Sequence, residues 1–200
     1  MPGTGGIGLL GGTFDPVHLG HLAVARQVAA ALALSSVYLV PSNRPPHRRA
    51  PAAPPADRLA MARIATADEA GIGVLDVELG RGGVSYTVDT LRELRDRWPG
   101  EALVLLLGWD AARLFSTWKE PQAIAELCAL AVFNRAGESQ PAAADLEAAG
   151  LPPATRLLAV ESPDISATAV RRRLATGGDV SSMVPPGVLA YIRKRHLYGA

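Results

Sequence analysis

The stretch Gly11-Gly-Thr-Phe-Asp-Pro-Val-His-Leu-Gly-His-Leu22 decides how the fold of this sequence is predicted. Before it, the apolar run Ile7–Leu10 is typical of a short buried strand. After it, the alanine-rich segment Leu22–Leu34 contains no glycine or proline and predicts a helix. The glycines and histidines of Gly11–Leu22 therefore lie on the turn between a first strand and a first helix. In open α/β sheets that turn binds ligands, outside the carboxyl end of the strand.

The residue types on this turn suit a phosphate group. Gly11 and Gly12 carry no side chain, so backbone N–H groups can approach a ligand closely. The start of the helix adds free N–H groups and the positive end of its dipole. His18 and His21 are three residues apart, share one helix face and can donate hydrogen bonds to phosphate oxygens. The structural alternative is a strand–turn–helix corner with a capping histidine.

A second glycine pattern overlaps the first strand. The residues Gly6-Ile-Gly-Leu-Leu-Gly11 fit the G-x-G-x-x-G fingerprint of dinucleotide-binding loops. That fingerprint needs a strand before it and an acidic residue about 20 positions later. Here its residues form the strand, and no acidic residue occurs between Asp15 and Asp57. We therefore do not interpret it as a binding loop for a preformed dinucleotide.

Composition limits the class of protein. A length of 200 residues predicts a single domain over residues 1–200, and 20 basic against 19 acidic residues give no overall field that would attract nucleic acid. The single cysteine, Cys128, lies in an apolar run and suits a reducing compartment. No run of 18 apolar residues and no leader-like start occurs, so we expect a cytoplasmic protein without membrane contact. The histidines and the cysteine lack zinc-type spacing, and we expect no dedicated metal site.

Apolar runs alternate with helical patterns along the rest of the chain. The predicted strands are Val37–Val40, Ile72–Val77, Ala102–Leu107, Ala129–Phe133 and Arg156–Val160. The predicted helices are Asp57–Ala70, Thr87–Trp98, Gln122–Leu127, Ser166–Ala175 and Gly187–Arg195. This alternation predicts an α/β fold: a Rossmann-like open parallel sheet with helices on both faces and a C-terminal helical segment. We expect Gly137–Pro153, rich in alanine, glycine and proline, to be a surface excursion and the least ordered part.

Two stretches at opposite ends of the chain resemble one superfamily. Gly11–His21 resembles the GxFDPxHxGH-type signature of a nucleotidyltransferase superfamily that includes adenylyltransferases for nicotinate mononucleotide and for phosphopantetheine. Ile165-Ser-Ala-Thr-Ala-Val-Arg171 resembles its ISSTxIR motif, with Ala167 in place of the usual second serine. The resemblance implies that Ile165, Ser166 and Arg171 bind ATP. A serine at a helix start can donate to phosphate oxygens, and an arginine can hold a triphosphate.

A basic loop follows the second predicted strand. From the residues alone, Pro41-Ser-Asn-Arg-Pro-Pro-His-Arg48 is a stiff, positively charged loop that either binds an anion or forms ordinary surface. It resembles the PxxxPPHK stretch of bacterial nicotinate mononucleotide adenylyltransferases, with Arg48 where that family often has lysine. The resemblance implies that His47 and Arg48 contact the substrate. Whether Pro41–Pro55 closes over the substrate stays open.

Two further motifs match the same family. Ser85-Tyr-Thr-Val-Asp-Thr90 resembles its SYTxDTL stretch, which implies that Thr87 offers its N–H and hydroxyl to the pyridine carboxylate; a helix N-cap at Ser85 or Thr87 is the alternative. Gly108-Trp-Asp110 followed by Trp118 resembles the LGxD…W pattern. It implies that Gly108 and Asp110 bind ATP and that Trp118 lies against the pyridine ring. For Asp110, which suits a ribose hydroxyl, an N-cap is again the alternative.

The resemblance implies an adenylyl transfer from ATP to nicotinate mononucleotide, giving nicotinate adenine dinucleotide and pyrophosphate in NAD biosynthesis. His18 and His21 would hold phosphate oxygens of ATP beside Gly11. Gly12, Thr13 and Phe14 would hold the incoming phosphate. Arg135, in a stretch that resembles the family's R-P-G turn, would lie near adenine.

Other features of such an enzyme are left open or only implied. Magnesium would arrive with ATP. Two other functions remain open: phosphopantetheine adenylyltransferase, which shares the two end motifs, and a module that senses a nucleotide without turnover. Oligomeric state is also open, a homodimer included.

Overall fold

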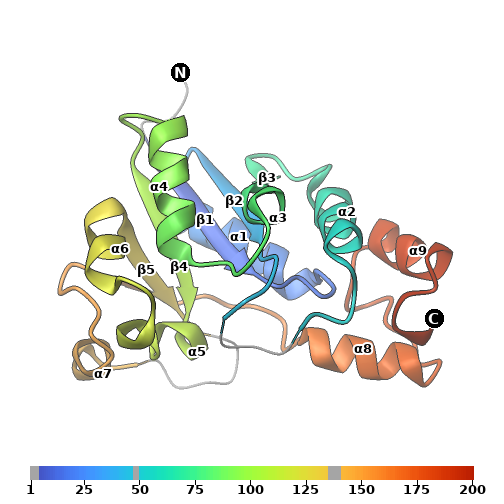
Figure 1. Cartoon of the computed structure of the whole chain (residues 1–200). Coiled ribbons are helices and arrows are strands. Elements are labelled where there is room, and N and C mark those ends of the chain that lie inside the picture. The colour runs from blue at the N-terminus through green and yellow to red at the C-terminus, as the bar shows by residue number, and fades with distance from the viewer. Residues whose placement is uncertain (1–4, 47–49, 135–140) are drawn as a thin grey trace.

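The computed structural model describes residues 5–46, 50–134 and 141–200, which contain one sheet of six parallel strands. The strands are β1 (Ile7–Gly12), β2 (Ser36–Pro41), β3 (Ile72–Val74), β4 (Leu103–Gly108), β5 (Ala129–Phe133) and β6 (Arg156–Leu158), in the order β3-β2-β1-β4-β5-β6 (Figure 1). Consecutive strands proceed outward from β1 in one direction and from β4 in the other. This confirms the predicted Rossmann-like open parallel sheet.

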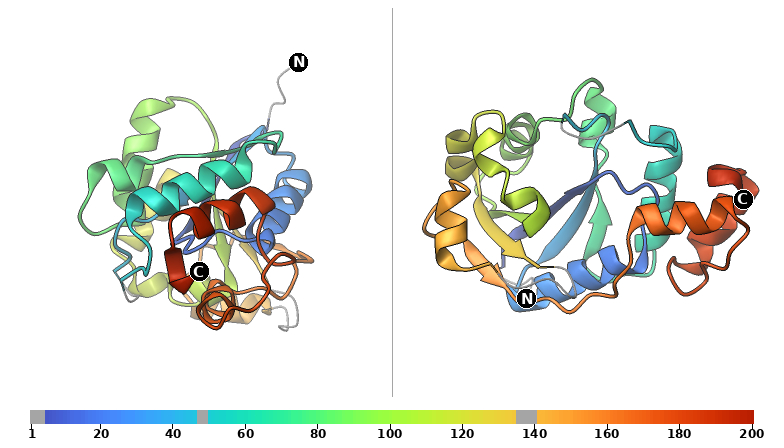
Figure 2. Two further views of the ribbon diagram at one scale, coloured as in Figure 1. Left: turned by 90° about the vertical axis from the view of Figure 1, so that its right-hand side faces the viewer. Right: turned by 90° about the horizontal axis from the view of Figure 1, so that it is seen from below.

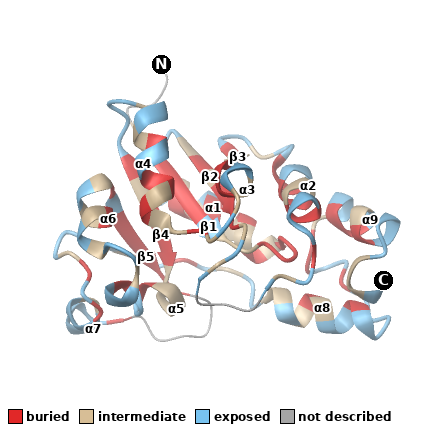
Figure 3. Cartoon of the chain, in the orientation of Figure 1, coloured by how far each residue is buried: buried red, intermediate tan, exposed pale blue. Residues whose placement is uncertain are grey.

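The two central strands are buried on both faces, as their apolar sequences predict. In β1, Leu9 belongs to one hydrophobic cluster and Leu10 to the other, because neighbouring strand residues point to opposite faces. The first cluster lies under α4 (Thr87–Arg97) and α6 (Pro121–Leu127), and the second lies under α1 (Leu19–Ala31). Helices therefore cover both faces, and their buried sides appear red in Figure 3.

The C-terminal helices pack at one edge of the molecule. Helix α2 (Pro55–Thr66) contacts α9 (Pro186–Lys194), and α8 (Ala167–Ala175) contacts the final 3-10 turn η2 (Leu197–Gly199). Figure 2 shows this C-terminal segment in orange and red beside α2. The remaining helical pieces are α3 (Val77–Arg81), α5 (Trp109–Ala112), η1 (Phe115–Thr117) and α7 (Ala143–Ala148). The predicted C-terminal helical segment is confirmed.

Several boundaries differ from the predicted ones. Helix α1 begins at Leu19, three residues before the predicted start, because His18 is its N-cap and the backbone N–H of His18 donates to Nδ1 of His21 at 3.2 Å. Strand β3 ends at Val74, so the prediction of a strand up to Val77 is wrong there. A short helix, α3, begins at Val77 instead, which the apolar run had hidden.

The described part of the predicted surface excursion contains a helix that the sequence analysis did not predict. Residues 141–153 contain α7, and both Ala149 and Leu151 are buried in the cluster under α4 and α6. None of the residues of α7 is buried, which agrees with a surface excursion, and the expectation that this is the least ordered part stays a prediction. The Oδ2 atom of Asp145 accepts a hydrogen bond from the Ala142 N–H at 2.7 Å at the start of this helix, a local contact that composition alone does not indicate.

The overlapping glycine pattern serves packing. Gly8 lies inside β1, and a Cβ there would come 2.7 Å from Leu34 Cδ1 and 3.1 Å from Leu106 Cδ1. The missing side chain makes room for core residues, which agrees with rejecting a dinucleotide loop. No helix among the described residues is long and apolar enough to span a membrane.

Candidate active site

A cavity of about 670 Å³ opens at the carboxyl ends of β1 and β4, where the strand order reverses. Every predicted site residue that the structure describes lines it: Gly11, Gly12, Thr13, Phe14, His18, His21, Thr87, Gly108, Asp110, Trp118, Ile165, Ser166 and Arg171. The predicted residues His47, Arg48 and Arg135 lie outside the described residues. Segments from across the whole chain thus meet at one cavity.

The two histidines form a stacked pair at the start of α1. Their ring centroids are 3.7 Å apart with an interplanar angle of 25°, and the Phe14 ring meets His21 edge-on at 4.9 Å. His18 is 6% exposed. Gly20 packs closely beside it, because a Cβ at that position would lie 3.1 Å from Nδ1 of His18 and would press on the ring. Both imidazoles are therefore held in place at the positive end of a helix, which suits an anion.

Gly11 and Gly12, which precede the histidines, each leave room for a different purpose. A Cβ on Gly12 would lie 2.9 Å from the Phe14 ring, so Gly12 allows that ring to fold back over the strand end. A Cβ on Gly11 would meet no atom within 4 Å, and since Gly11 lines the cavity, any side chain there would extend into open space beside it. The strand end thus exposes backbone to a ligand.

The second motif meets the first directly. Ser166 is the N-cap of α8, and its Oγ accepts a hydrogen bond from the Ala169 N–H at 3.1 Å. Arg171 donates from Nη1 to the backbone carbonyl of Asp15 at 2.6 Å and from Nη2 to Thr168 Oγ1 at 3.2 Å. Asp15 and Arg171 are 156 residues apart in sequence. A guanidinium whose side chain is 31% exposed is thereby fixed at the edge of the cavity.

The opposite wall is formed by the start of α4 and by the segment around η1. Tyr86 is the N-cap of α4 and makes no capping bond through its side chain, so neither Ser85 nor Thr87 is the N-cap. Lys119 Nζ lies 4.8 Å from the centroid of the Tyr86 ring and pairs with Asp89 at 3.0 Å. Thr87, Trp118 and Lys119 all line the cavity. This wall offers a backbone N–H, a hydroxyl, an aromatic face and a cation.

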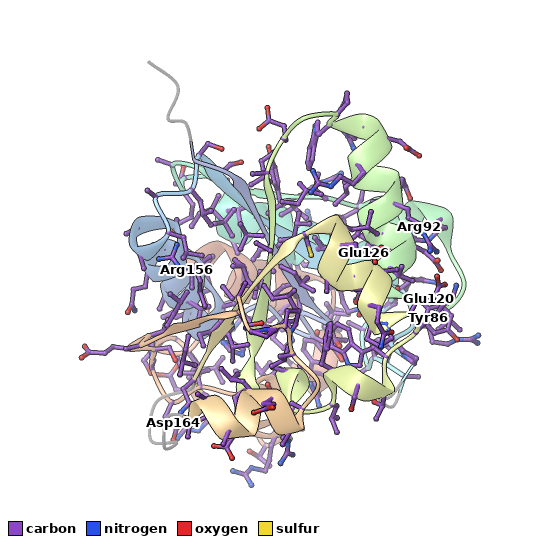
Figure 4. All side chains as sticks on the ribbon, turned by 90° about the vertical axis from the view of Figure 1, so that its left-hand side faces the viewer. Tyr86, Arg92, Glu120, Glu126, Arg156 and Asp164 are labelled. Carbon is purple, nitrogen blue, oxygen red and sulfur yellow. The ribbon has the colours of Figure 1, made fainter. Side chains whose placement is uncertain are left out.

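Outside the cavity, an ion pair links the two helices of this wall. Arg92 on α4 and Glu120, the N-cap of α6, pair at the surface and lie on the same side as Tyr86 (Figure 4). The guanidinium lowers the pKa of Glu120. Because both groups face solvent, we assign this pair little stabilising effect.

Asp110 lies two residues beyond the N-cap of the short helix that follows β4. Gly108 is the N-cap of α5, and Asp110 is in the first helical turn. A Cβ on Gly108 would lie 2.8 Å from Oδ1 of Asp110, so the carboxylate folds back over the strand end, where a ligand hydroxyl could meet it. The N-cap alternative for Asp110 is therefore wrong.

The cavity also contains polar residues that sequence reasoning did not single out. They include Asp15, Ser42, Glu78, Lys119, Ser162 and Asp164. Among the described residues, the buried Oγ of Ser42 finds no hydrogen-bond partner, so a ligand is free to supply one. Ser42 lies just past β2, and the rule that drew attention to Asp110 could have found it. Burial raises the pKa of Glu78.

The described residues include no group of three histidine, cysteine or acidic side chains placed to hold a metal ion. A metal that arrives bound to a nucleotide would need few protein ligands, since magnesium keeps several waters and takes phosphate oxygens.

Comparisons with known proteins agree with this geometry. The cytidylyltransferase-like family model matches residues 9–173. The chain is 43% identical to a protein of Thermus thermophilus and 42% identical to one of Marinobacter nauticus, both named "Probable nicotinate-nucleotide adenylyltransferase"; 96% of this chain aligns with 98% and 96% of those proteins. A solved structure titled "Plasmodium falciparum nicotinic acid mononucleotide adenylyltransferase complexed with NaAD" has the same fold, with a TM-score of 0.78 at 19% identity over 96% of this chain and 97% of that one. The chain therefore belongs to the cytidylyltransferase-like family and, within it, to the group of the nicotinate-nucleotide adenylyltransferases.

Proposed function

We propose that this protein transfers the adenylyl group of ATP to nicotinate mononucleotide, forming nicotinate adenine dinucleotide and releasing pyrophosphate. The observation that carries the proposal is the direct contact between Arg171 and Asp15, which brings both phosphate-binding motifs to one cavity. A volume of about 670 Å³ also lies within the range of small-molecule sites. The names of the relatives in Thermus and Marinobacter support the same assignment.

The chemistry needs positioning and charge stabilisation more than a side-chain base. The 5′-phosphate of the mononucleotide attacks the α-phosphorus of ATP, forms a new P–O bond, and pyrophosphate leaves with the electrons of the broken bond. A phosphate monoester is already a competent nucleophile. His18 and His21 donate to the oxygens of the α- and β-phosphates as negative charge builds there. Arg171 and Ser166 hold the β- and γ-phosphates.

The acceptor lies between the first loop and the wall formed by α4 and η1. Gly12, Thr13 and Phe14 hold its phosphate through backbone N–H groups and the threonine hydroxyl. Thr87 faces the pyridine carboxylate, and Trp118 lies against the ring. The basic loop adds His47 and Arg48 to the acceptor side, and Ser42 offers its free hydroxyl there.

The rest of ATP lies on the other side of the strand ends. Gly108 and Asp110 contact its ribose, with Gly11 and Ile165 beside it. For Arg135, which lies outside the described residues, the role near adenine rests on the resemblance of its sequence stretch alone. Magnesium would arrive with the triphosphate. Phosphate oxygens and water molecules would be the ligands of the ion. We further propose that the reaction takes place in the cytoplasm, where a lone buried cysteine stays reduced.

Two rival functions would use the same cavity. Phosphopantetheine adenylyltransferase shares the two end motifs, but its acceptor has no aromatic ring that carries a carboxylate. Thr87, Trp118 and Lys119 on the wall formed by α4 and η1 would then have no matching group. A nucleotide sensor could lack a group needed for turnover. Here His18, His21 and Arg171 all line the cavity, which favours an enzyme.

The test is pyrophosphate release from MgATP with three acceptors offered separately: nicotinate mononucleotide, nicotinamide mononucleotide and phosphopantetheine. We expect strong preference for the first, because a carboxylate is read by the α4 start. Preference for phosphopantetheine would overturn the acceptor assignment. ATP binding without turnover on any acceptor would indicate a sensor.

A further inference from the structure

The last turn of the chain reaches back to the first motif. Tyr198, in η2, donates its phenolic O–H to Oδ1 of Asp15 at 2.7 Å, across 183 residues of sequence. Asp15 is 4% exposed and lines the cavity, whereas Tyr198 does not. A residue outside the cavity therefore touches one that forms its wall.

Asp15 connects three segments around the phosphate-binding loop. Its carboxylate accepts hydrogen bonds from the Ala52 N–H at 2.7 Å and from the Ala53 N–H at 3.0 Å, at the far end of the loop that follows β2. Its backbone carbonyl accepts the bond from Arg171. Any movement of Asp15 would therefore displace the guanidinium that holds the triphosphate.

Two residues at the chain end adopt an uncommon backbone conformation beside this contact. Both His196 (φ 51°) and Tyr198 (φ 61°) adopt left-handed conformations that side-chain-bearing residues rarely take. This turn brings the phenol back to Asp15. Burial and the bond to Asp15 also raise the pKa of Tyr198, so the phenol remains a hydrogen-bond donor.

A buried cation lies next to the same carboxylate. Arg58 is fully buried, and it donates to the carbonyls of Thr13 at 2.7 Å and of Asn43 at 3.2 Å. Burial lowers the pKa of Arg58, and the negative charge of Asp15 opposes that shift. Oδ2 of the same carboxylate lies 3.9 Å from Nη1 of Arg171, so Asp15 carries the negative charge that faces both the arginine under the loop and the arginine at the cavity edge.

We propose that Tyr198 is a positioning residue for the triphosphate side of the cavity, acting through Asp15 on Arg171. This inference rests on the proposed function, since it concerns where ATP is held. The hydroxyl fixes the carboxylate, the carboxylate fixes its own peptide unit, and that peptide carbonyl orients Nη1 of Arg171. Among the residues that the structure describes, Thr87 and Trp118 make no hydrogen bond to these groups, so the acceptor wall should be spared.

The chain supplies a matched control. Tyr191 on α9 donates to Oδ1 of Asp57 at 2.8 Å, and Asp57 is also 4% exposed. This is the same kind of bond, from the same C-terminal segment, to an equally buried carboxylate. Neither Tyr191 nor Asp57 lines the cavity. Tyr191→Phe should therefore cost stability as Tyr198→Phe does, without touching ATP.

The experiment compares the full-length wild type, Tyr198→Phe and Tyr191→Phe in thermal unfolding and in steady-state kinetics. We expect Tyr198→Phe to lower kcat/KM for MgATP about tenfold, with KM for nicotinate mononucleotide within about twofold of wild type. Tyr191→Phe should change both parameters by less than about twofold. An unchanged MgATP parameter in Tyr198→Phe, or an equal loss in both variants, overturns the proposal.

A second measurement tests the route through Arg171. In an Arg171→Lys background, which keeps the charge but removes the forked guanidinium, adding Tyr198→Phe should have little further effect on MgATP. A full tenfold effect in that background would rule out the route. If the wild type transfers adenylyl to no acceptor, the proposed function fails, and MgATP affinity measured by calorimetry in the same variants decides the inference by the same comparison. Absence of MgATP binding by the wild type would overturn both.

Discussion

His21 has two roles in the first turn of α1: its Nδ1 accepts the His18 N–H, and its ring lines the cavity. We expect His21→Ala to lower turnover by about 10²–10³, the typical loss of one preorganised donor. Removing the capping acceptor should also cost about 1 kcal/mol of stability. Pyrophosphate release and urea unfolding measure the two effects.

The two roles of His21 can be separated by a second variant. Asparagine presents an amide oxygen at nearly the reach of Nδ1 but no group at the position of Nε2. His21→Asn should therefore recover most of the lost stability while turnover stays low. Wild-type turnover in either variant would mean that the phosphate site has been assigned wrongly.

Glu78 is a second residue whose environment makes a testable statement. It is buried, it accepts a hydrogen bond from Thr90 Oγ1 at 2.8 Å, and desolvation raises its pKa above the ordinary 4.5. The folded state therefore holds a proton that the unfolded state has already released. The stability that this group contributes is complete below about pH 4.5 and is lost as the pH rises through its folded-state pKa.

We therefore expect Glu78→Gln to flatten the fall of stability above pH 4.5. The measurement is urea unfolding of wild type and variant from pH 4.5 to 8. Glu93→Gln is the control, because Glu93 is an exposed carboxylate that pairs with Arg81 at 2.9 Å, and the charge of Arg81 also acts on Glu78. The difference in unfolding free energy between Glu78→Gln and wild type should grow as the pH rises. A constant difference would mean that Glu78 carries no raised pKa.

At the scale of single elements, helix α8 shows how one residue can serve both fold and site. Ser166 caps the helix through its Oγ and lines the cavity. Ser166→Ala should cost about 1 kcal/mol of stability and lower turnover, because the helix start and Arg171 move together. Thermal unfolding and pyrophosphate release follow the two effects.

Ser166→Asp distinguishes capping from phosphate binding. Aspartate is a good N-cap and complements the helix dipole, so the stability should return to near the wild-type value. Its negative charge would face the triphosphate, so turnover should fall below that of Ser166→Ala. Wild-type turnover in Ser166→Asp would show that position 166 does not face the triphosphate.

The elements also show how far the sequence reaches. Strands such as β4, an apolar run at the centre of the sheet, were predictable because burial on both faces requires such a run. Helix α3 was not, because its five residues are too few to show a helical period. Helix α7 was hidden for a related reason: its small residues resemble a loop in composition.

The site residues also divide into those that the sequence could predict and those that it could not. The rule that ligands gather at the carboxyl ends of parallel strands pointed to Gly11 and Asp110, and both line the cavity. The contacts that hold the loops could not be predicted. They join residues such as Asp15 and Tyr198, whose distance in sequence says nothing about their distance in space. Such pairs become visible only when the packing of whole helices is known.

At the scale of the whole molecule, two hydrophobic clusters on opposite faces of one sheet must separate together for the chain to unfold. Cys128, the one cysteine in the sequence, lies 5% exposed in the cluster under α4 and α6. Burial raises the pKa of its thiol from 9.0 to about 12. Because the thiolate is the reactive form and the folded state buries this thiol, the native chain should react with iodoacetamide at pH 8 only through open molecules, and therefore far more slowly than the urea-unfolded chain.

Labelling of Cys128 should therefore report global opening, and ligand binding should slow it. A ligand that binds the folded state alone lowers the population of open molecules, and at a concentration 100 times its Kd the rate should fall by about 100-fold. The measurement is mass-spectrometric labelling kinetics with and without MgATP, in wild type and in His21→Ala. Rapid labelling of the native wild type, unaffected by MgATP, would mean that the face under α4 and α6 opens independently of the cavity.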